Sequence, residues 1–183
     1  MQLALDVTRP YSFAQTLAFV RRFPPCQGDY LVTDDALTAA VTIGDRAVSF
    51  TLSAPRGQLV VEVEGAHAEA VARCAVDFVG ARDDLAPLYA AAQDDPPFAA
   101  LVAQLHGLHH VRFLTLAEIA VYCVMMQRTP IKLAAALKRR FLARFGVPVE
   151  VAGHTLRAMP SLDAVAALAP DELGAAIGHA RKG

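Results

Sequence analysis

The sequence lacks the features that mark secreted and membrane proteins. Its three cysteines, Cys26, Cys74 and Cys123, are odd in number, widely spaced and without a paired motif, which argues against a disulfide framework and favours a reducing compartment. No apolar run reaches the ~18 residues that a transmembrane helix needs. The first residues also have neither the basic start nor the cleavage site of a signal peptide. We therefore expect a cytoplasmic protein without a membrane partner.

Several kinds of catalytic and metal site are missing as well. The chain has no Ser-His-Asp order, no phosphate-binding glycine loop and no iron–sulfur cysteine set. His106, His109 and His110 lack a companion cysteine pair or a helical His pair with a Glu, so we interpret them as linker histidines and expect no metal. Asp94-Asp95 precedes Pro96 and is interpreted as helix capping. We assign no catalytic base within the chain and expect no cofactor.

The net charge of −1 conceals an asymmetry between the two halves of the chain. Residues 1–100 carry 7 Lys and Arg against 13 Asp and Glu, whereas residues 101–183 carry 10 against 5. The halves therefore differ in sign, at −6 and +5. A partner with phosphates should be met by the C-terminal half, although charge of this kind also occurs on ordinary solvated helix faces.

The N-terminal third predicts a small antiparallel α+β unit. Ala36–Ile43 and Ala47–Ser53 alternate apolar and polar residues across a Gly44-Asp45 turn, and a further strand covers Leu59–Val63. Asp34-Asp35 is assigned to a turn. Further predicted elements are edge strands at Leu3–Val7 and Tyr30–Thr33, a helix over Tyr11–Phe23 with Ser12 as N-cap, and a covering helix over Ala66–Val79.

From Asp83 onward the pattern predicts helices to the end of the chain, with a turn at Ala152-Gly153-His154. A hydrophobic fraction of 55%, much of it alanine, supports a sizeable helical core. The expected fold class is α+β, with the antiparallel unit in residues 1–80 and an all-helical domain in residues 81–183. One expected helix is capped by Asp83 or Asp84 and runs through Ala92. The other expected helices cover Pro96–Leu105, Leu116–Met126, Pro130–Phe145, Ser161–Leu168 and Pro170–Ile177.

The most informative stretch is the helix Leu116–Met126 together with the residues directly after it. The helix is apolar almost all round, so we expect it at the buried centre of the helical domain. It ends in two long polar side chains, Gln127 and Arg128. Thr129-Pro130 then restarts a helix, with Thr as N-cap and Pro at the first helical position. Two polar side chains beside a fresh helix N-terminus suit contact with nucleic acid.

The next helix has an apolar stripe and a basic face. Lys132 and Arg139 belong to the basic face and are candidates for phosphate contact. Lys138 is a further candidate, and the run Lys138-Arg139-Arg140 is interpreted either as a solvated helix face or as a phosphate-binding one. Arg181 and Lys182 form another basic pair near the C-terminus.

These pieces, in this order, resemble the helix-hairpin-helix superfamily of DNA glycosylases, in its 3-methyladenine glycosylase II branch. That family has an apolar helix ending in a Gln that faces DNA, then a wedge residue, then a Ser or Thr that starts the next helix. Gln127, Arg128 and Thr129 match these positions. The matching flanks are Asp84-Leu85-Ala86-Pro87-Leu88-Tyr89 to Asp95-Pro96, Leu101-Val102, Leu105-His106-Gly107-Leu108, Met159-Pro160-Ser161-Leu162, Ala169-Pro170-Asp171-Glu172-Leu173, Gly178 and Arg181-Lys182.

The resemblance implies a base-excision repair protein that flips and hydrolyses alkylated purines in double-stranded DNA, located at the nucleoid. It implies that Arg128 fills the vacancy left by the flipped base, and that Thr129 with the N–H groups of Ile131 and Lys132 holds a phosphate. An N-terminal antiparallel α+β domain on an all-helical DNA-binding core is also what the family has.

One departure concerns the chemistry. In the family a glycine-containing hairpin and the catalytic Asp follow the basic pair, whereas this chain ends at Gly183 and contains no Leu-Pro-Gly-x-Gly hairpin. We therefore expect the catalytic Asp to be absent from these residues. The alternatives are a non-catalytic DNA-binding or interaction module on the same scaffold, and a glycosylase for oxidised guanine.

Overall fold

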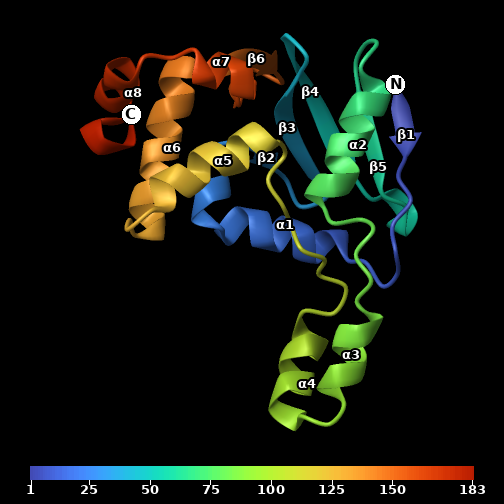
Figure 1. The fold of residues 1–183 in the computed structure, drawn as a ribbon. Helices are drawn as coiled ribbons and strands as arrows, with labels where there is room; N and C mark the ends of the chain where they lie inside the picture. Colours follow the sequence, from blue (N-terminus) through green and yellow to red (C-terminus); the bar gives the residue numbers. More distant parts are fainter.

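A computed structural model describes all residues, 1–183, and its N-terminal part forms a five-stranded antiparallel sheet on one side of the molecule (Figure 1). The strand order is β1-β5-β4-β3-β2. The strands are β1 (Gln2–Ala4), β2 (Leu31–Val32), β3 (Ala36–Ile43), β4 (Arg46–Ser53) and β5 (Val60–Val63). The expected N-terminal meander is confirmed, with shorter edge strands than the sequence indicated.

The alternating pattern of the strands turns one face of the sheet toward two helices. Leu37, Ala39 and Val41 of β3 are buried on this face, and so are Phe50 and Leu52 of β4. Against them pack α1 (Phe13–Arg22), with Ser12 as its N-cap, and α2 (Ala68–Phe78). These residues belong to the largest apolar core of the molecule.

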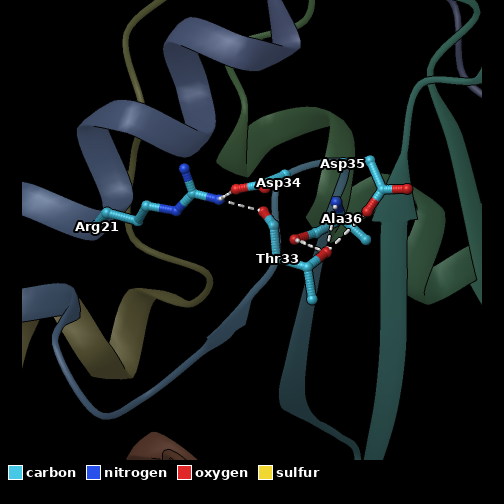
Figure 2. A network of polar contacts seen from close by, with 5 residues as sticks. All are labelled: Arg21, Thr33, Asp34, Asp35 and Ala36. Carbon is cyan, nitrogen blue, oxygen red and sulfur yellow. Dashed lines mark hydrogen bonds and ion pairs between the residues drawn. The ribbon is translucent and has the colours of Figure 1, made fainter.

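The turn between β2 and β3 is fixed by polar side chains, which Figure 2 shows. The hydroxyl group of Thr33 donates to the Asp35 carboxylate at 2.9 Å and accepts from the Ala36 N–H at 3.1 Å. The Arg21 guanidinium, from α1, donates to the Thr33 carbonyl and pairs with Asp34 at 3.0 Å. The assignment of Asp34-Asp35 to a turn is confirmed.

The prediction of helices from Asp83 to the end is wrong in one place. Two strands, β6 (Val147–Val151) and β7 (His154–Ala158), form a hairpin whose tip residues Ala152 and Gly153 both have positive φ, at 50° and 76°. Such φ values match the twist of a two-residue hairpin turn. The hairpin buries Leu156 and Ala158 against Ala40, on the sheet face away from α1 and α2. The C-terminal part is therefore not all-helical.

Two short helices form a hairpin that projects from the rest of the molecule (Figure 1). They are α3 (Ala86–Ala92) and α4 (Pro96–Gln104), with the Asp95 carboxylate capping α4 at 3.0 Å from the Phe98 N–H. At the base of the hairpin, His109 is buried, and its ring nitrogens lie 2.7 and 2.8 Å from the Gly80 and Pro10 carbonyl oxygens. His109 is therefore a structural residue that joins the two chain segments at the base.

The remaining helices pack around a second, smaller core. They are α5 (Leu116–Met126), α6 (Ile131–Phe145), α7 (Leu162–Ala166) and α8 (Pro170–Ile177). Three short 3-10 turns complete the fold, η1 (Pro24–Cys26), η2 (Pro55–Gly57) and η3 (Ala180–Lys182). None of the helices combines the length and the apolar character that crossing a bilayer requires.

Helix α5 is not buried on all sides, contrary to the expectation from its composition. Ala117, Tyr122 and Met125 are buried in the second core, but Leu116 is 70% exposed and Ile119 and Val124 are 40% and 44% exposed. An apolar helix therefore has one face in the core and one apolar face open. Its composition alone does not show which face has a packing partner.

Candidate nucleic-acid interface

The turn between α5 and α6 places three polar residues at one end of the helix pair. Helix α5 ends at Met126, and Gln127 is its C-cap. The Thr129 N–H donates to the Met126 carbonyl at 3.1 Å, which closes the turn around Arg128. Helix α6 then begins at Ile131, with Pro130 at the N-cap position.

The expectation that Thr129 caps α6 is wrong. The helix begins one residue later than predicted, and its N-cap, Pro130, has no side-chain hydrogen bond to the helix. The Thr129 hydroxyl instead donates to the Gln127 carbonyl at 2.9 Å, within the turn itself. Thr129 therefore stabilises the turn, and α6 starts without a side-chain cap.

Arg128 has an unusual backbone conformation at the tip of this turn. Its φ is +52°, in the left-handed region that L residues with side chains avoid at a cost of roughly 1–2 kcal/mol. The side chain is exposed and makes no hydrogen bond or ion pair. Arg56 has a similar φ of +53° and is also exposed, so the backbone conformation does not by itself identify a site. What marks Arg128 is that its unpaired, planar guanidinium lies at the end of the α5–α6 pair, where it is open to a partner outside the chain.

A second segment meets the turn from the C-terminal end of the chain. The Lys182 ammonium, in η3, donates to the carbonyls of Val124 at 2.9 Å, Met125 at 3.0 Å and Gln127 at 2.8 Å. These carbonyls belong to the last turn of α5 and its C-cap. An ammonium group has three N–H donors, and all three are engaged here. In this structure Lys182 therefore has none left for a phosphate, contrary to our expectation.

The two segments together line one hollow of the surface. Its lining is entirely polar, contains no carboxylate and consists of Gln127, Arg128, Thr129, His179, Arg181 and Lys182. Residues predicted separately from two distant stretches of sequence thus lie at one place. The Gln127, Arg128 and Arg181 side chains have N–H donors that are not used within the chain, and the hollow carries positive charge, so it suits an acceptor-rich, anionic partner.

The basic residues of α6 divide between the surface and the interior. Lys132 and Arg139 are exposed, as a role in phosphate contact requires. Lys138 is 1% exposed and lies in the interior, so the expectation that it contacts phosphate is wrong. The adjacent Arg140 donates to the Ile177 carbonyl at 3.0 Å, at the end of α8.

Lys138 is the centre of a buried charged cluster. Its Nζ lies 2.5 Å from Glu118 Oε1 of α5 and 2.5 Å from Asp29 Oδ2, and it donates to the Pro25 carbonyl at 3.0 Å. Glu118 also accepts the Leu114 N–H at 3.0 Å. The cluster therefore connects α6, α5 and the segment from η1 to Asp29, which precedes β2.

The charge state of Lys138 is set by its position between two carboxylates. Burial by itself would lower the pKa of Lys138, but Glu118 and Asp29 outweigh it and hold that pKa above its ordinary value. Burial raises the pKa of Asp29, against the opposing pull of Lys138. The lysine therefore stays charged between its two carboxylate partners. The cluster is structural, and Glu118 is not free to act as a base.

Comparisons with known proteins agree with this architecture. The chain shares its fold with solved 3-methyladenine and 8-oxoguanine DNA glycosylases, so the resemblance seen in the sequence is confirmed at the level of the fold. No family model matches the chain. The solved 3-methyladenine DNA glycosylase from Archaeoglobus fulgidus superposes with a TM-score of 0.79 at 19% identity, over 100% of this chain and 63% of that one.

Two further relatives are of the same class. The DNA-3-methyladenine glycosylase of Bacillus subtilis (strain 168) is 24% identical over 152 residues, which are 79% of this chain and 50% of that protein. The Clostridium acetobutylicum 8-oxoguanine glycosylase/lyase, solved with dsDNA containing cytosine opposite 8-oxoG, has a TM-score of 0.66 at 10% identity. That match covers 100% of this chain and 61% of the other. The chain thus spans about half to three-fifths of its relatives.

Proposed function

We propose that this chain is a DNA-binding part of a base-excision repair glycosylase for alkylated purines, acting on double-stranded DNA at the bacterial nucleoid. The observation that carries the proposal is the α5–α6 turn, with a strained, unpaired Arg128 beside a hollow lined by donors. The alkylpurine class is favoured over oxidised guanine because the 3-methyladenine relative superposes with a TM-score of 0.79, against 0.66 for the 8-oxoguanine enzyme.

In the proposed mechanism Arg128 enters the duplex where a base has been turned out. A flipped base leaves a vacancy in the stack, and an inserted side chain stabilises the distorted duplex. The guanidinium plane stacks on neighbouring bases, and its N–H groups reach acceptor atoms on the base left opposite. Gln127 lies beside Arg128 and contacts the same step, while Lys132 and Arg139 contact phosphates along α6.

We assign no catalytic role to residues 1–183. Hydrolysis of the glycosidic bond needs a carboxylate that stabilises the cationic sugar, and no carboxylate lines the hollow. We expect these residues by themselves to bind DNA without releasing 3-methyladenine or 7-methylguanine from alkylated duplex. Release above the uncatalysed rate in a single-turnover assay would overturn this assignment.

The proposed function is tested by binding to two duplexes, one undamaged and one with an abasic analogue. Arg128→Ala should weaken binding to the abasic duplex by ~1–3 kcal/mol, the scale of one stacked or base-edge contact. Binding to undamaged DNA should change by no more than one phosphate contact. The matched control is Lys132→Ala, on the exposed face of α6, which should lower both affinities alike.

Each other outcome has a definite meaning. Equal losses on both duplexes for Arg128→Ala would make Arg128 a phosphate contact and reject the wedge. Wild-type binding that does not fall with salt, or no binding at low salt, would reject DNA as the partner, because phosphate contacts release counterions. Tight binding without any preference for the abasic duplex would favour the alternative, a DNA-binding module without a base-flipping role.

A further inference from the structure

Lys182 and the α5–α6 turn are held together by three convergent hydrogen bonds. The carbonyls of Val124, Met125 and Gln127 all accept from the same Nζ, at 2.8 to 3.0 Å. Carbonyl groups in the last turn of a helix lack their usual partner four residues on and carry the negative partial charge of the helix, and the Val124 carbonyl accepts only the Gln127 N–H besides Lys182, at 3.3 Å. A lysine 55 residues further along the chain than Gln127 supplies both the donors and the opposite charge.

The Gln127 carbonyl is the link between Lys182 and Arg128. It accepts from the Lys182 ammonium at 2.8 Å and from the Thr129 hydroxyl at 2.9 Å. The peptide group that joins Gln127 to Arg128 is therefore held from two sides. The residue after this peptide group has a φ of +52°, which L residues adopt only where the surroundings enforce it.

We infer that Lys182 is a positioning residue for DNA recognition, which holds Arg128 in its strained conformation through the end of α5 and does not itself contact DNA. This inference rests on the proposed function, in which Arg128 is the wedge. It differs from a phosphate contact in how the ammonium is used. A lysine that binds phosphate contributes mainly its charge and can be replaced by arginine. This lysine instead directs three N–H groups from one nitrogen to three carbonyls that surround it.

Two substitutions at position 182 separate the two roles. Lys182→Ala removes donors and charge, and Lys182→Arg keeps the charge but replaces a compact ammonium by a longer, planar guanidinium. Because a planar fork cannot direct three N–H groups from one nitrogen to three convergent carbonyls, we expect both variants to lose roughly tenfold in affinity for the abasic duplex, the scale of one base contact. A phosphate contact predicts that Lys182→Arg binds as well as wild type.

The salt dependence of binding gives an independent measure. The plot of log affinity against log salt concentration has a negative slope, and removing one phosphate contact reduces the magnitude of that slope by ~0.9. We expect Lys182→Ala to leave the slope unchanged, since the number of phosphate contacts stays the same. The control is Arg181→Ala, the exposed neighbour that has no hydrogen bond within the chain, which should reduce the magnitude of the slope by ~0.9 if Arg181 contacts phosphate.

The free protein provides a readout that does not depend on DNA. Amide hydrogen exchange at Thr129, whose N–H donates to the Met126 carbonyl at 3.1 Å, should become faster in both Lys182 variants and stay unchanged in Arg181→Ala. Unchanged exchange at Thr129 in both Lys182 variants, a salt slope reduced in magnitude in Lys182→Ala, or wild-type affinity in Lys182→Arg would each overturn the inference.

The failure of the inference and the failure of the proposed function are distinguishable. If wild type shows no preference for the abasic duplex, the proposed function is wrong. The role of Lys182 in DNA recognition is then rejected as well, even if the Lys182 variants show faster amide exchange at Thr129. If wild type prefers the abasic duplex but Lys182→Arg matches it, only the inference fails.

Discussion

Removing the buried ammonium of Lys138 should destabilise the protein strongly. Lys138→Met keeps much of the length and the apolar stem of the side chain but leaves Glu118 and Asp29 without their cation. Both carboxylates are largely buried, with side chains 7% and 11% exposed. Breaking a buried ion pair by removing one partner costs ~3–5 kcal/mol, because the remaining charge is uncompensated.

That loss is large compared with the stability of an ordinary domain, about 5–15 kcal/mol in total. It can be measured as the free energy of unfolding in urea, followed by circular dichroism. The matched control is Lys132→Met on the exposed face of the same helix, which should change the free energy by less than about 0.5 kcal/mol. Combining Lys138→Met with Glu118→Gln and Asp29→Asn should recover part of the loss.

The pH dependence gives this prediction a sign. The pKa of Lys138 lies above its ordinary value in the folded protein, so its contribution is present at neutral pH and is lost as pH rises beyond about 10.5 through the folded pKa. In Lys138→Met the unpaired carboxylates can take up protons in acid, so the deficit should be smaller at pH 4 than at pH 7. A loss below about 1 kcal/mol at pH 7, typical of an exposed pair, would refute the buried cluster.

Three further predictions test the turn, the hairpin base and the first helix. Arg128→Gly should raise the free energy of unfolding in urea by ~0.5–1 kcal/mol, since glycine relieves the positive φ at some entropic cost, while affinity for abasic DNA falls; a loss of stability would contradict the strain. Gly80→Ala should destabilise by ~1–3 kcal/mol in the same assay, because its φ is +62° and a Cβ would lie 2.7 Å from the His110 carbonyl oxygen; a neutral effect would contradict this close approach. Burial raises the pKa of Tyr11 to about 12, so stability should fall as pH rises from 10 toward 12. Tyr11→Phe should flatten that fall in urea titrations, and an unchanged slope would reject the assignment.

Where local pattern and tertiary packing agree, the sequence predicts the fold closely. Strand β3 and helix α5 have the bounds that alternation and apolar periodicity indicate, and Asp95 caps the helix that it was expected to cap. The β6–β7 hairpin was missed because its strands are short, Pro148 interrupts one of them, and Ala152 is not a usual residue at positive φ. Its stability comes from packing on Ala40, a contact that the local sequence does not reveal.

Only part of the candidate interface was predictable, because contacts with distant segments decide where a side chain lies. Gln127 and Arg128 were named from the polar end of an apolar helix and from the resemblance to glycosylases, and Arg181 from that resemblance. The structure brings all three into one hollow, while their roles remain predictions. Lys138 and Lys182 were misassigned because a lysine in a basic run gives no sign of where its ammonium lies. Burial and convergent carbonyls are properties of distant segments, which periodicity cannot place. Glu118 has one local signal, its capping-box spacing from Thr115, whose hydroxyl accepts the Glu118 N–H at 3.1 Å.

The contacts between the N-terminal sheet and the late segments of the chain have a consequence for the order of folding. The Thr42 hydroxyl in β3 donates to the Met159 carbonyl, 117 residues further along the chain. The Pro25 carbonyl accepts a hydrogen bond from the Lys138 ammonium, which is 113 residues away. During synthesis the first eighty residues emerge without these partners, with Asp29 still lacking its counter-ion and Ala40 still uncovered. Because long-range contacts of this kind slow folding, we expect the sheet to reach its final packing only after α6 and the β6–β7 hairpin have been made. The first segment to be synthesised is then among the last to become fully stable.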